Sequence, residues 1–330
     1  MFHRILVPLD GSRRAEAAIP VAAQLARATH GTVILMRSVV PLTPYGPYLT
    51  EPVGPASTVS SQQRDAVVSY LNQLTSDDDL AGLTVLTRVT EGPAADSILT
   101  LSQTEEANLI VLCAHGVTGY HRWKLGGVAQ HVVRHAQTPV LLLNEYSPGS
   151  PAKQFAKVRR ALVPLDGSLL AEAAISPAIQ LLAAVAPQSG RLRLLRIINP
   201  FDAEDQGAAQ ADLINEANAY LGRLVEQLRA ARTDELRLGF DSSVVVDTDP
   251  AERILSVAEP TYNSLRETPE KAFGYDLIVM ATHGRTGILR WTLGSIAERV
   301  LQATGLPLLI VRPIAATPAG ATTRSSAAHA

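Results

Sequence analysis

LVPLDGS, residues 6–12, recurs without a change at residues 162–168. A second identical segment, AEAAI, follows each copy, at residues 15–19 and 171–175. Each LVPLDGS joins a short apolar run to a glycine and a serine, the pattern of a buried strand that turns into a capped helix. Because the copies lie about 150 residues apart, the size of one domain, the chain is predicted to hold two repeated domains rather than an array of short repeats.

The repeat continues into a glycine-rich segment late in each half. His115-Gly116 corresponds to His283-Gly284, and Gly126-Gly127 corresponds to Gly294-Ser295. The offset between the copies grows from 156 residues at LVPLDGS to 168 residues here, which places an insertion around residues 260–273. Surface loops tolerate such insertions, so we expect the second half to have the same fold as the first despite the insertion.

Short apolar runs alternate with helical patterns in the same order in both halves. The predicted strands are residues 5–9, 32–40, 84–89, 109–114 and 140–143, then 161–165, 192–198, 243–246, 277–281 and 308–311. Strands interleaved with helices are typical of a parallel, doubly wound α/β sheet. The first helix of each half is predicted to continue past Pro20 or Pro177, with a kink at the proline.

Composition shifts divide the chain into four parts. Residues 1–145 and 158–312 are predicted to be the two domains. Residues 146–157 contain a run of proline, glycine and serine, which predicts a linker. Residues 313–330 are rich in alanine, threonine and serine, which predicts a disordered tail.

Composition also narrows the function classes. The 330 residues are 46% apolar and carry a formal charge of −2, a balance that argues against a dedicated nucleic-acid surface. The single cysteine, Cys113, excludes an intrachain disulfide and favours a reducing compartment. No apolar run approaches the roughly 20 residues that span a bilayer, and the N-terminus lacks the shape of a signal peptide. We therefore expect a cytoplasmic protein that contacts neither nucleic acid nor membrane.

Ligands of doubly wound sheets bind beyond the carboxyl ends of the strands. Two loops with unusual composition follow strands one and four of each half, and they face one crevice if these strands are neighbours. Asp10 and Asp166, in the first of these loops, either shape the turn and cap the helix or accept hydrogen bonds from ribose hydroxyls. Composition alone leaves both readings open.

The loop after strand four has the composition of a phosphate site. Glycine lets the backbone approach a ligand closely, and a helix that starts at Gly294-Ser295 offers free N–H groups and the positive end of its dipole. The alternative is an ordinary turn before a helix. His115 and His283 are predicted to hold the loop by hydrogen bonds, because no catalytic partner lies near either of them in the sequence.

Each half resembles a universal stress protein domain, over almost all of residues 2–312. The nucleotide-binding pattern of that family is glycine, two residues, glycine, nine residues, then glycine followed by serine or threonine. In the second half Gly284, Gly294 and Ser295 match it, and Ala281 replaces the first glycine. The strand-one motif that ends in Asp-Gly-Ser also resembles that of the family, in both halves, and in the second half it runs through Pro164 and Asp166.

The first half departs further from the pattern. Gly116 and Gly126 match, but Cys113 replaces the first glycine and Gly127 replaces the final serine or threonine. A β-carbon at Cys113 is expected to strain the backbone by about 1–2 kcal/mol. The missing hydroxyl at Gly127 is expected to remove one hydrogen bond to phosphate, so the sequence predicts weaker binding in the first half.

The resemblance implies a fold and a ligand. Each domain would be a five-stranded parallel sheet, in the order 3-2-1-4-5, flanked by helices. Asp10 and Asp166 would contact the ribose or adenosine, and the backbone of Ser38 and Ile197 would read the edge of the adenine. The glycine loop would hold the phosphates of ATP, with Mg²⁺.

The resemblance also implies partners and a function. Domains of this family often pair through strand five, and this chain could make that pairing within itself or form a homodimer. The leading hypothesis is an ATP-binding regulatory protein of the stress response, with an unknown protein partner. The alternatives are a slow ATP-hydrolysing enzyme and a nucleotide-free interaction module. The sequence contains no Walker-type motif, and no dinucleotide-binding G-x-G-x-x-G follows the first strand of either half, so neither a P-loop enzyme nor a dinucleotide oxidoreductase is indicated.

Overall fold

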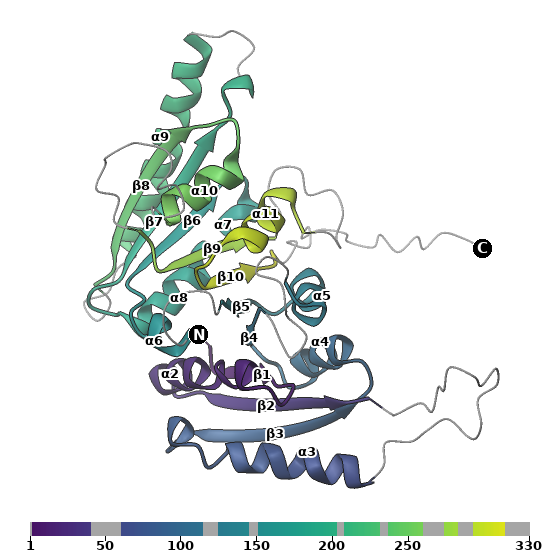
Figure 1. Ribbon diagram of the computed structural model, residues 1–330. Coiled ribbons are helices and arrows are strands. Elements are labelled where there is room, and N and C mark those ends of the chain that lie inside the picture. Colours follow the sequence, from purple (N-terminus) through teal and green to yellow (C-terminus); the bar gives the residue numbers. More distant parts are fainter. Residues whose placement is uncertain are drawn as a thin grey trace, which may run out of the picture.

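Within the described residues, the chain forms one ten-stranded sheet in the order β3-β2-β1-β4-β5-β10-β9-β6-β7-β8 (Figure 1). The structure is a computed structural model that describes residues 2–40, 61–114, 125–144, 151–202, 208–231, 237–259, 274–282 and 293–313. The strands are β1 (Arg4–Pro8), β2 (Thr32–Val39), β3 (Thr84–Glu91), β4 (Leu109–Cys113), β5 (Val140–Leu143), β6 (Arg160–Leu165), β7 (Arg191–Ile198), β8 (Gly239–Val246), β9 (Leu277–Ala281) and β10 (Leu308–Val311).

The two halves repeat one topology. Strands β1 to β5 form the first domain and lie in the order 3-2-1-4-5, and strands β6 to β10 form the second domain with the equivalent order. All neighbouring strands within a domain pair in parallel. The predicted fold class is therefore confirmed, although β8 begins four residues earlier than its predicted strand at 243.

The domains meet through their fifth strands. β5 pairs antiparallel with β10, with Leu141 opposite Leu309. The side-chain amide of Asn144 donates to the carbonyl oxygens of Thr304 and Leu306, at 2.9 and 3.1 Å. The pairing expected through strand five thus occurs within the chain, and we call this β5–β10 junction the seam.

Helices cover both faces of the sheet (Figure 1). They are α1 (Arg13–Glu16), α2 (Ile19–Thr29), α3 (Ser61–Leu74), α4 (Ala94–Thr104), α5 (Gly127–His135), α6 (Pro151–Phe155), α7 (Leu169–Glu172), α8 (Ile175–Val185), α9 (Ala208–Ala230), α10 (Pro250–Ala258) and α11 (Ser295–Ala303). Side chains of α4, α5, α10 and α11 share one apolar core, and those of the remaining helices share the core of the opposite face. Each core contains residues of both domains, because the sheet is continuous across the seam.

The first helix of each half is broken rather than kinked. In the first half α1 ends at Glu16 and α2 starts at Ile19, so Pro20 lies in the first turn of a new helix. Pro177 likewise lies in the first turn of α8. The predicted kink is wrong because first-turn N–H groups need no intrahelical partner, and proline costs little there.

A short helix lies inside the segment predicted as a linker. Residues Pro151–Phe155 form α6, and the Phe155 side chain is fully buried in the core that α2 and α8 share. Helix α6 packs against α2 of the first domain immediately before the chain enters β6. The connection is therefore part of the packed structure over these residues.

Candidate functional site at the carboxyl ends of the strands

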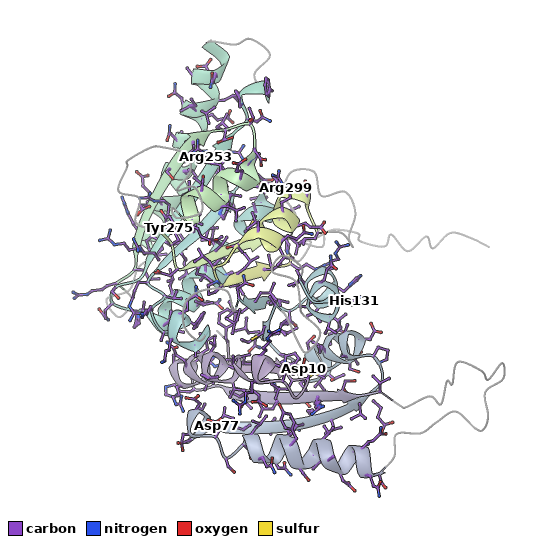
Figure 2. All side chains as sticks on the ribbon, viewed as in Figure 1. Asp10, Asp77, His131, Arg253, Tyr275 and Arg299 are labelled. Carbon is purple, nitrogen blue, oxygen red and sulfur yellow. The ribbon has the colours of Figure 1, made fainter. Side chains whose placement is uncertain are left out.

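The two motif-bearing strands of each domain are neighbours. β1 pairs with β4 through Ile5 and Leu109, and β6 pairs with β9 through Ala161 and Leu277. This confirms the adjacency that the sequence argument assumed. Because the strands are parallel, the loops after β1 and β4 leave the sheet at the same edge, as do the loops after β6 and β9. Asp10 and Asp77 lie toward opposite ends of the strands of the first domain (Figure 2).

The strand-one aspartates shape tight turns. Asp10 Oδ1 accepts hydrogen bonds from the backbone N–H and the hydroxyl of Ser12, at 2.9 and 2.6 Å. Asp166 Oδ1 accepts the same two bonds from Ser168, at 3.0 and 2.6 Å. Each serine hydroxyl in turn caps the helix that follows. The turn-shaping role is thus present in both copies, and it fixes where each carboxylate sits.

Ser38 and Ile197 present backbone groups to the strand-one loops. The carbonyl of Met36 accepts from Leu9, whereas the carbonyl of Val39 accepts from Gly92 on the opposite side. The backbone N–H and carbonyl groups of successive residues point to alternate sides of a strand, so those of Ser38 point toward the side of β1. At this level β1 has already ended, because its last residue, Pro8, pairs with Met36. Ile197 occupies the equivalent position, next to the end of β6, where Pro164 pairs with Leu195.

The glycines before α5 and α11 have matching conformations. Gly126 donates its N–H to the Ala114 carbonyl at 2.9 Å, and Gly294 donates to the Thr282 carbonyl at 2.8 Å. Both have φ near −60°, and neither caps its helix with a side chain. The first helical residues, Gly127 and Ser295, are exposed. The N-terminal turn of each helix is thus held against the end of strand four and open to solvent.

Several predicted site residues lie outside the described part of the chain. They are the glycines Gly116 and Gly284 and the loop histidines His115 and His283. The structure therefore brings together only the two ends of each glycine-rich segment, at Ala114 and Gly126 in the first domain and at Thr282 and Gly294 in the second.

The strain predicted at Cys113 is wrong. Cys113 is the last residue of β4 and pairs with Leu143. The described non-glycine residues with positive φ are His30 and Glu106, so Cys113 adopts ordinary strand geometry. Its thiol is buried and donates to the carbonyl of Arg14, with 2.9 Å between sulfur and oxygen. Its equivalent Ala281 likewise ends β9, so the first position of the motif does not separate the two domains by backbone strain.

An arginine lies beneath the first strand-one turn. Gly11 has φ of +86°, and a β-carbon there would come within 2.7 Å of Nη1 of Arg37. The Arg37 guanidinium carbon lies 5.1 Å from the centre of the Tyr70 ring, and the Tyr70 hydroxyl donates to Glu16 at 2.9 Å. Burial and the hydrogen bond to Glu16 both raise the pKa of Tyr70.

The second domain repeats this arrangement. Gly167 has φ of +84°, and a β-carbon there would lie 3.5 Å from the buried guanidinium of Arg196. The hydroxyl of Tyr220 donates to Glu172 at 2.8 Å, and burial, then this bond, raises its pKa. Sequence reasoning missed both clusters because their members come from three separated elements. The recurrence of an arginine within the two equivalent apolar strands is the signal that could have revealed them.

Ion pairs fix α11 against α10 in the second domain. Asp249 caps α10 by accepting from the N–H groups of Ala251 and Glu252. Its carboxylate also binds both terminal nitrogens of Arg299, at 2.8 and 2.6 Å. The hydrogen bond to Arg299 holds the pKa of Asp249 below its ordinary value. Figure 2 labels Arg299 on α11 and Arg253 on the neighbouring α10.

Comparison with known proteins assigns the family. The model of the universal stress protein family matches residues 1–144, 157–265 and 266–312. The chain belongs to the universal stress protein family. Its two strand-one turns and two glycine-rich helix starts are therefore features of two universal stress protein repeats.

Known proteins match this chain over one or both repeats. A universal stress protein of Mycolicibacterium smegmatis is 24% identical over 319 residues, which cover 94% of this chain and 97% of the relative. A solved universal stress protein from Archaeoglobus fulgidus, 16% identical, superposes with a TM-score of 0.65 over 94% of this chain and 99% of its own. Another structure from A. fulgidus, in complex with dAMP, is 22% identical over 43% of this chain and 98% of its own, with a TM-score of 0.32.

Neither membrane-spanning helices nor clusters of metal-ligating side chains occur among the described residues. No helix among them is both long enough and apolar enough to cross a bilayer. No group of three histidine, cysteine, aspartate or glutamate side chains in the same residues could hold a metal ion.

Proposed function

We propose that this universal stress protein binds ATP as a regulatory protein of the stress response, without fast catalysis. The observation that carries the proposal is the pairing, in each domain, of an aspartate turn and a glycine helix start at the ends of two neighbouring parallel strands. Ligands of doubly wound sheets occupy this edge. Binding would alter the conformation or the protein partners of the two-domain chain.

Each part of the nucleotide has a matching group in the second domain. Asp166 would accept hydrogen bonds from the ribose, and the backbone of Ile197 would contact the edge of the base. The N-terminal turn of α11, with the Ser295 hydroxyl, would hold the phosphates, since free N–H groups and the helix dipole favour anions there. We assign Gly284 to the same phosphate-binding loop. We assign Pro164 and Ala281 to the lining of the nucleotide site.

We assign Mg²⁺ to the phosphates rather than to a cage of protein side chains. Mg²⁺ usually keeps several waters and binds through substrate phosphates with one or two carboxylates.

We propose that the two sites are unequal, with the second domain the stronger. Ser295 offers a hydroxyl at the first position of α11, whereas its equivalent Gly127 offers none. A hydrogen bond to a charged oxygen contributes about 1.5–3 kcal/mol, so this single difference predicts about tenfold or greater separation in affinity.

Replacing Gly294 by valine tests the proposal. A β-carbon on Gly294 would lie 3.1 Å from the Thr282 carbonyl oxygen, and the two methyl groups of valine would crowd the same helix start. We expect the purified wild-type protein to release ATP in a near-equimolar amount on denaturation, and the variant to bind ATP about tenfold or more weakly by calorimetric titration.

Gly222→Val is the matched control, because a β-carbon on Gly222 in α9 would meet nothing within 4 Å. It should leave ATP binding unchanged. A wild-type protein that is empty and binds no added ATP would overturn the proposal in favour of a module that works through protein contacts alone. Turnover on the order of 10 s⁻¹ with ATP and Mg²⁺ would instead identify a dedicated enzyme.

Gly127→Ser should strengthen the weaker site. A β-carbon on Gly127 meets nothing within 4 Å, and the residue is the first of α5, so serine fits without rearrangement. We expect ATP affinity in the first domain to rise about tenfold, measured in the Gly294→Val background so that the second site no longer dominates the titration. Gly127→Ala is the control, because alanine raises the helix propensity without adding a hydroxyl. An equal gain in ATP affinity with alanine would contradict the proposed role of the hydroxyl.

A further inference from the structure

Helices α5 and α11 touch across the seam near the proposed phosphate site of the second domain. Arg134, in the last turn of α5, forms an ion pair with Glu298, in the first turn of α11. Arg312, just after β10, donates to the backbone carbonyl of Arg134 and so fixes the end of α5 from the second domain. Figure 2 labels one residue on each of these two helices, His131 on α5 and Arg299 on α11.

Glu298 carries a negative charge into the turn where phosphate would bind. Its own backbone N–H donates to the carbonyl of Gly294, which places the residue one turn along α11 from Ser295. Side chains of a helix lean toward its N-terminus, so we expect the Glu298 carboxylate to lie nearer the helix start than its own Cα does, while it contacts Arg134. An unpaired carboxylate within the first turn of α11 would repel a polyphosphate bound at the helix start and would compete with it for the positive end of the helix dipole.

Arg134 is the group that neutralises this carboxylate, and it belongs to the other domain. Its side chain is 37% exposed and that of Glu298 is 32% exposed, so the pair is partly shielded from solvent. The Nε of Arg134 is buried and has no hydrogen-bond partner among the described residues. The guanidinium is thus held at the seam with Glu298 as its acidic partner.

We propose that Arg134 of the first domain is a positioning residue for polyphosphate in the second domain, acting through Glu298. The proposal rests on the proposed function. It adds that a residue of the first domain completes the stronger site, in the second domain, across the seam. By cancelling the charge of Glu298, Arg134 lets the α11 turn prefer ligands with several phosphates over those with one or none.

The repeat makes this device one-sided. Gln302 occupies the position in α11 that corresponds to Arg134, and Gln130 occupies the position in α5 that corresponds to Glu298. Neither carries a charge, so the first domain has no equivalent pair. The second domain therefore depends on the first for phosphate preference, and the reverse dependence is missing at these positions.

The test is a comparison of ATP, AMP and adenosine in the full chain. Calorimetric titration of Arg134→Met, which removes the charge but keeps much of the apolar stem, should show ATP binding about tenfold weaker. AMP should weaken by about threefold or less, and adenosine should not change, because fewer charges face Glu298. Arg134→Lys should bind all three like the wild type, since it retains the charge.

A double-variant cycle makes the mechanism specific. Glu298→Gln in the Arg134→Met background should restore ATP affinity to within about threefold of wild type, because the uncompensated carboxylate is gone. Arg193→Met is the matched control: it breaks another ion pair of the second domain, with Asp241, at a comparable exposure of 39%. Its ATP-to-AMP preference should stay at the wild-type value.

Each outcome decides between explanations. A wild-type ATP-to-AMP preference in Arg134→Met would overturn the inference and leave the proposed function intact. Equal weakening of ATP, AMP and adenosine, or no rescue by Glu298→Gln, would reduce Arg134 to a packing role. A wild-type chain that binds no nucleotide would overturn the proposed function and this inference together.

Discussion

Phe155→Ala is expected to lower the free energy of unfolding by about 3–5 kcal/mol, the usual cost of deleting a fully buried aromatic side chain. Phe155 is fully buried, in the core face that contains side chains of α2 and α8. The loss combines the transfer of the ring to water with a cavity that the surrounding helices fill only in part. Urea or guanidinium denaturation, followed by circular dichroism, measures it.

Phe201→Ala is the matched control for this prediction. Phe201 is 74% exposed, so its removal should change the free energy of unfolding by about 0.5 kcal/mol or less. A loss below about 1 kcal/mol for Phe155→Ala would contradict the packing of α6. The segment between the domains would then behave as a passive connection.

Truncation at the seam is the second prediction with a large effect. Leu141 and Leu309 lie opposite each other on β5 and β10, and both are fully buried in the same core face. Replacing either by alanine should cost about 2–5 kcal/mol. Because the two residues belong to different domains, each variant should destabilise both, and denaturation should show one transition rather than two.

A double-mutant cycle tests whether the domains are energetically coupled there. The combined variant should differ from the sum of the single variants by about 0.5–3 kcal/mol, as expected of residues in contact. Leu169→Ala, at a residue 83% exposed in α7, should have almost no effect. Strict additivity of Leu141→Ala and Leu309→Ala, with two separate transitions, would mean that the seam contributes little to stability.

The sequence predicted the sheet well because its evidence is local and repeated. LVPLDGS and the apolar runs place the same strands twice, and a parallel order then follows from the interleaved helices. Asp10 and Asp166 lie at one edge with the glycine helix starts because strands one and four are neighbours and because backbone hydrogen bonds hold Gly126 and Gly294 at the ends of β4 and β9.

The features that the sequence missed depend on contacts between distant residues. A segment rich in proline, glycine and serine gave no sign of α6, because the helix gains its stability from burying Phe155 against another domain. The arginine beneath each strand-one turn and the Arg134–Glu298 pair join residues far apart in the chain. The wrong prediction at Cys113 came from a motif that specifies glycine, whereas the local backbone is ordinary strand.

The seam makes the pairing of the two domains independent of protein concentration. Two separate chains that pair through their fifth strands form a dimer whose population falls as protein concentration falls. Joining the partners turns this association into an intramolecular step, with an effective concentration in the millimolar range for short connections. The fraction of chains in which the β5–β10 pair is formed is therefore independent of the expression level, and each pair contains one copy of each domain. With this fixed stoichiometry the two copies can differ in sequence: the first has Gly127 where the second has Ser295, the proposed phosphate donor, and it still places Arg134 against Glu298 of the second.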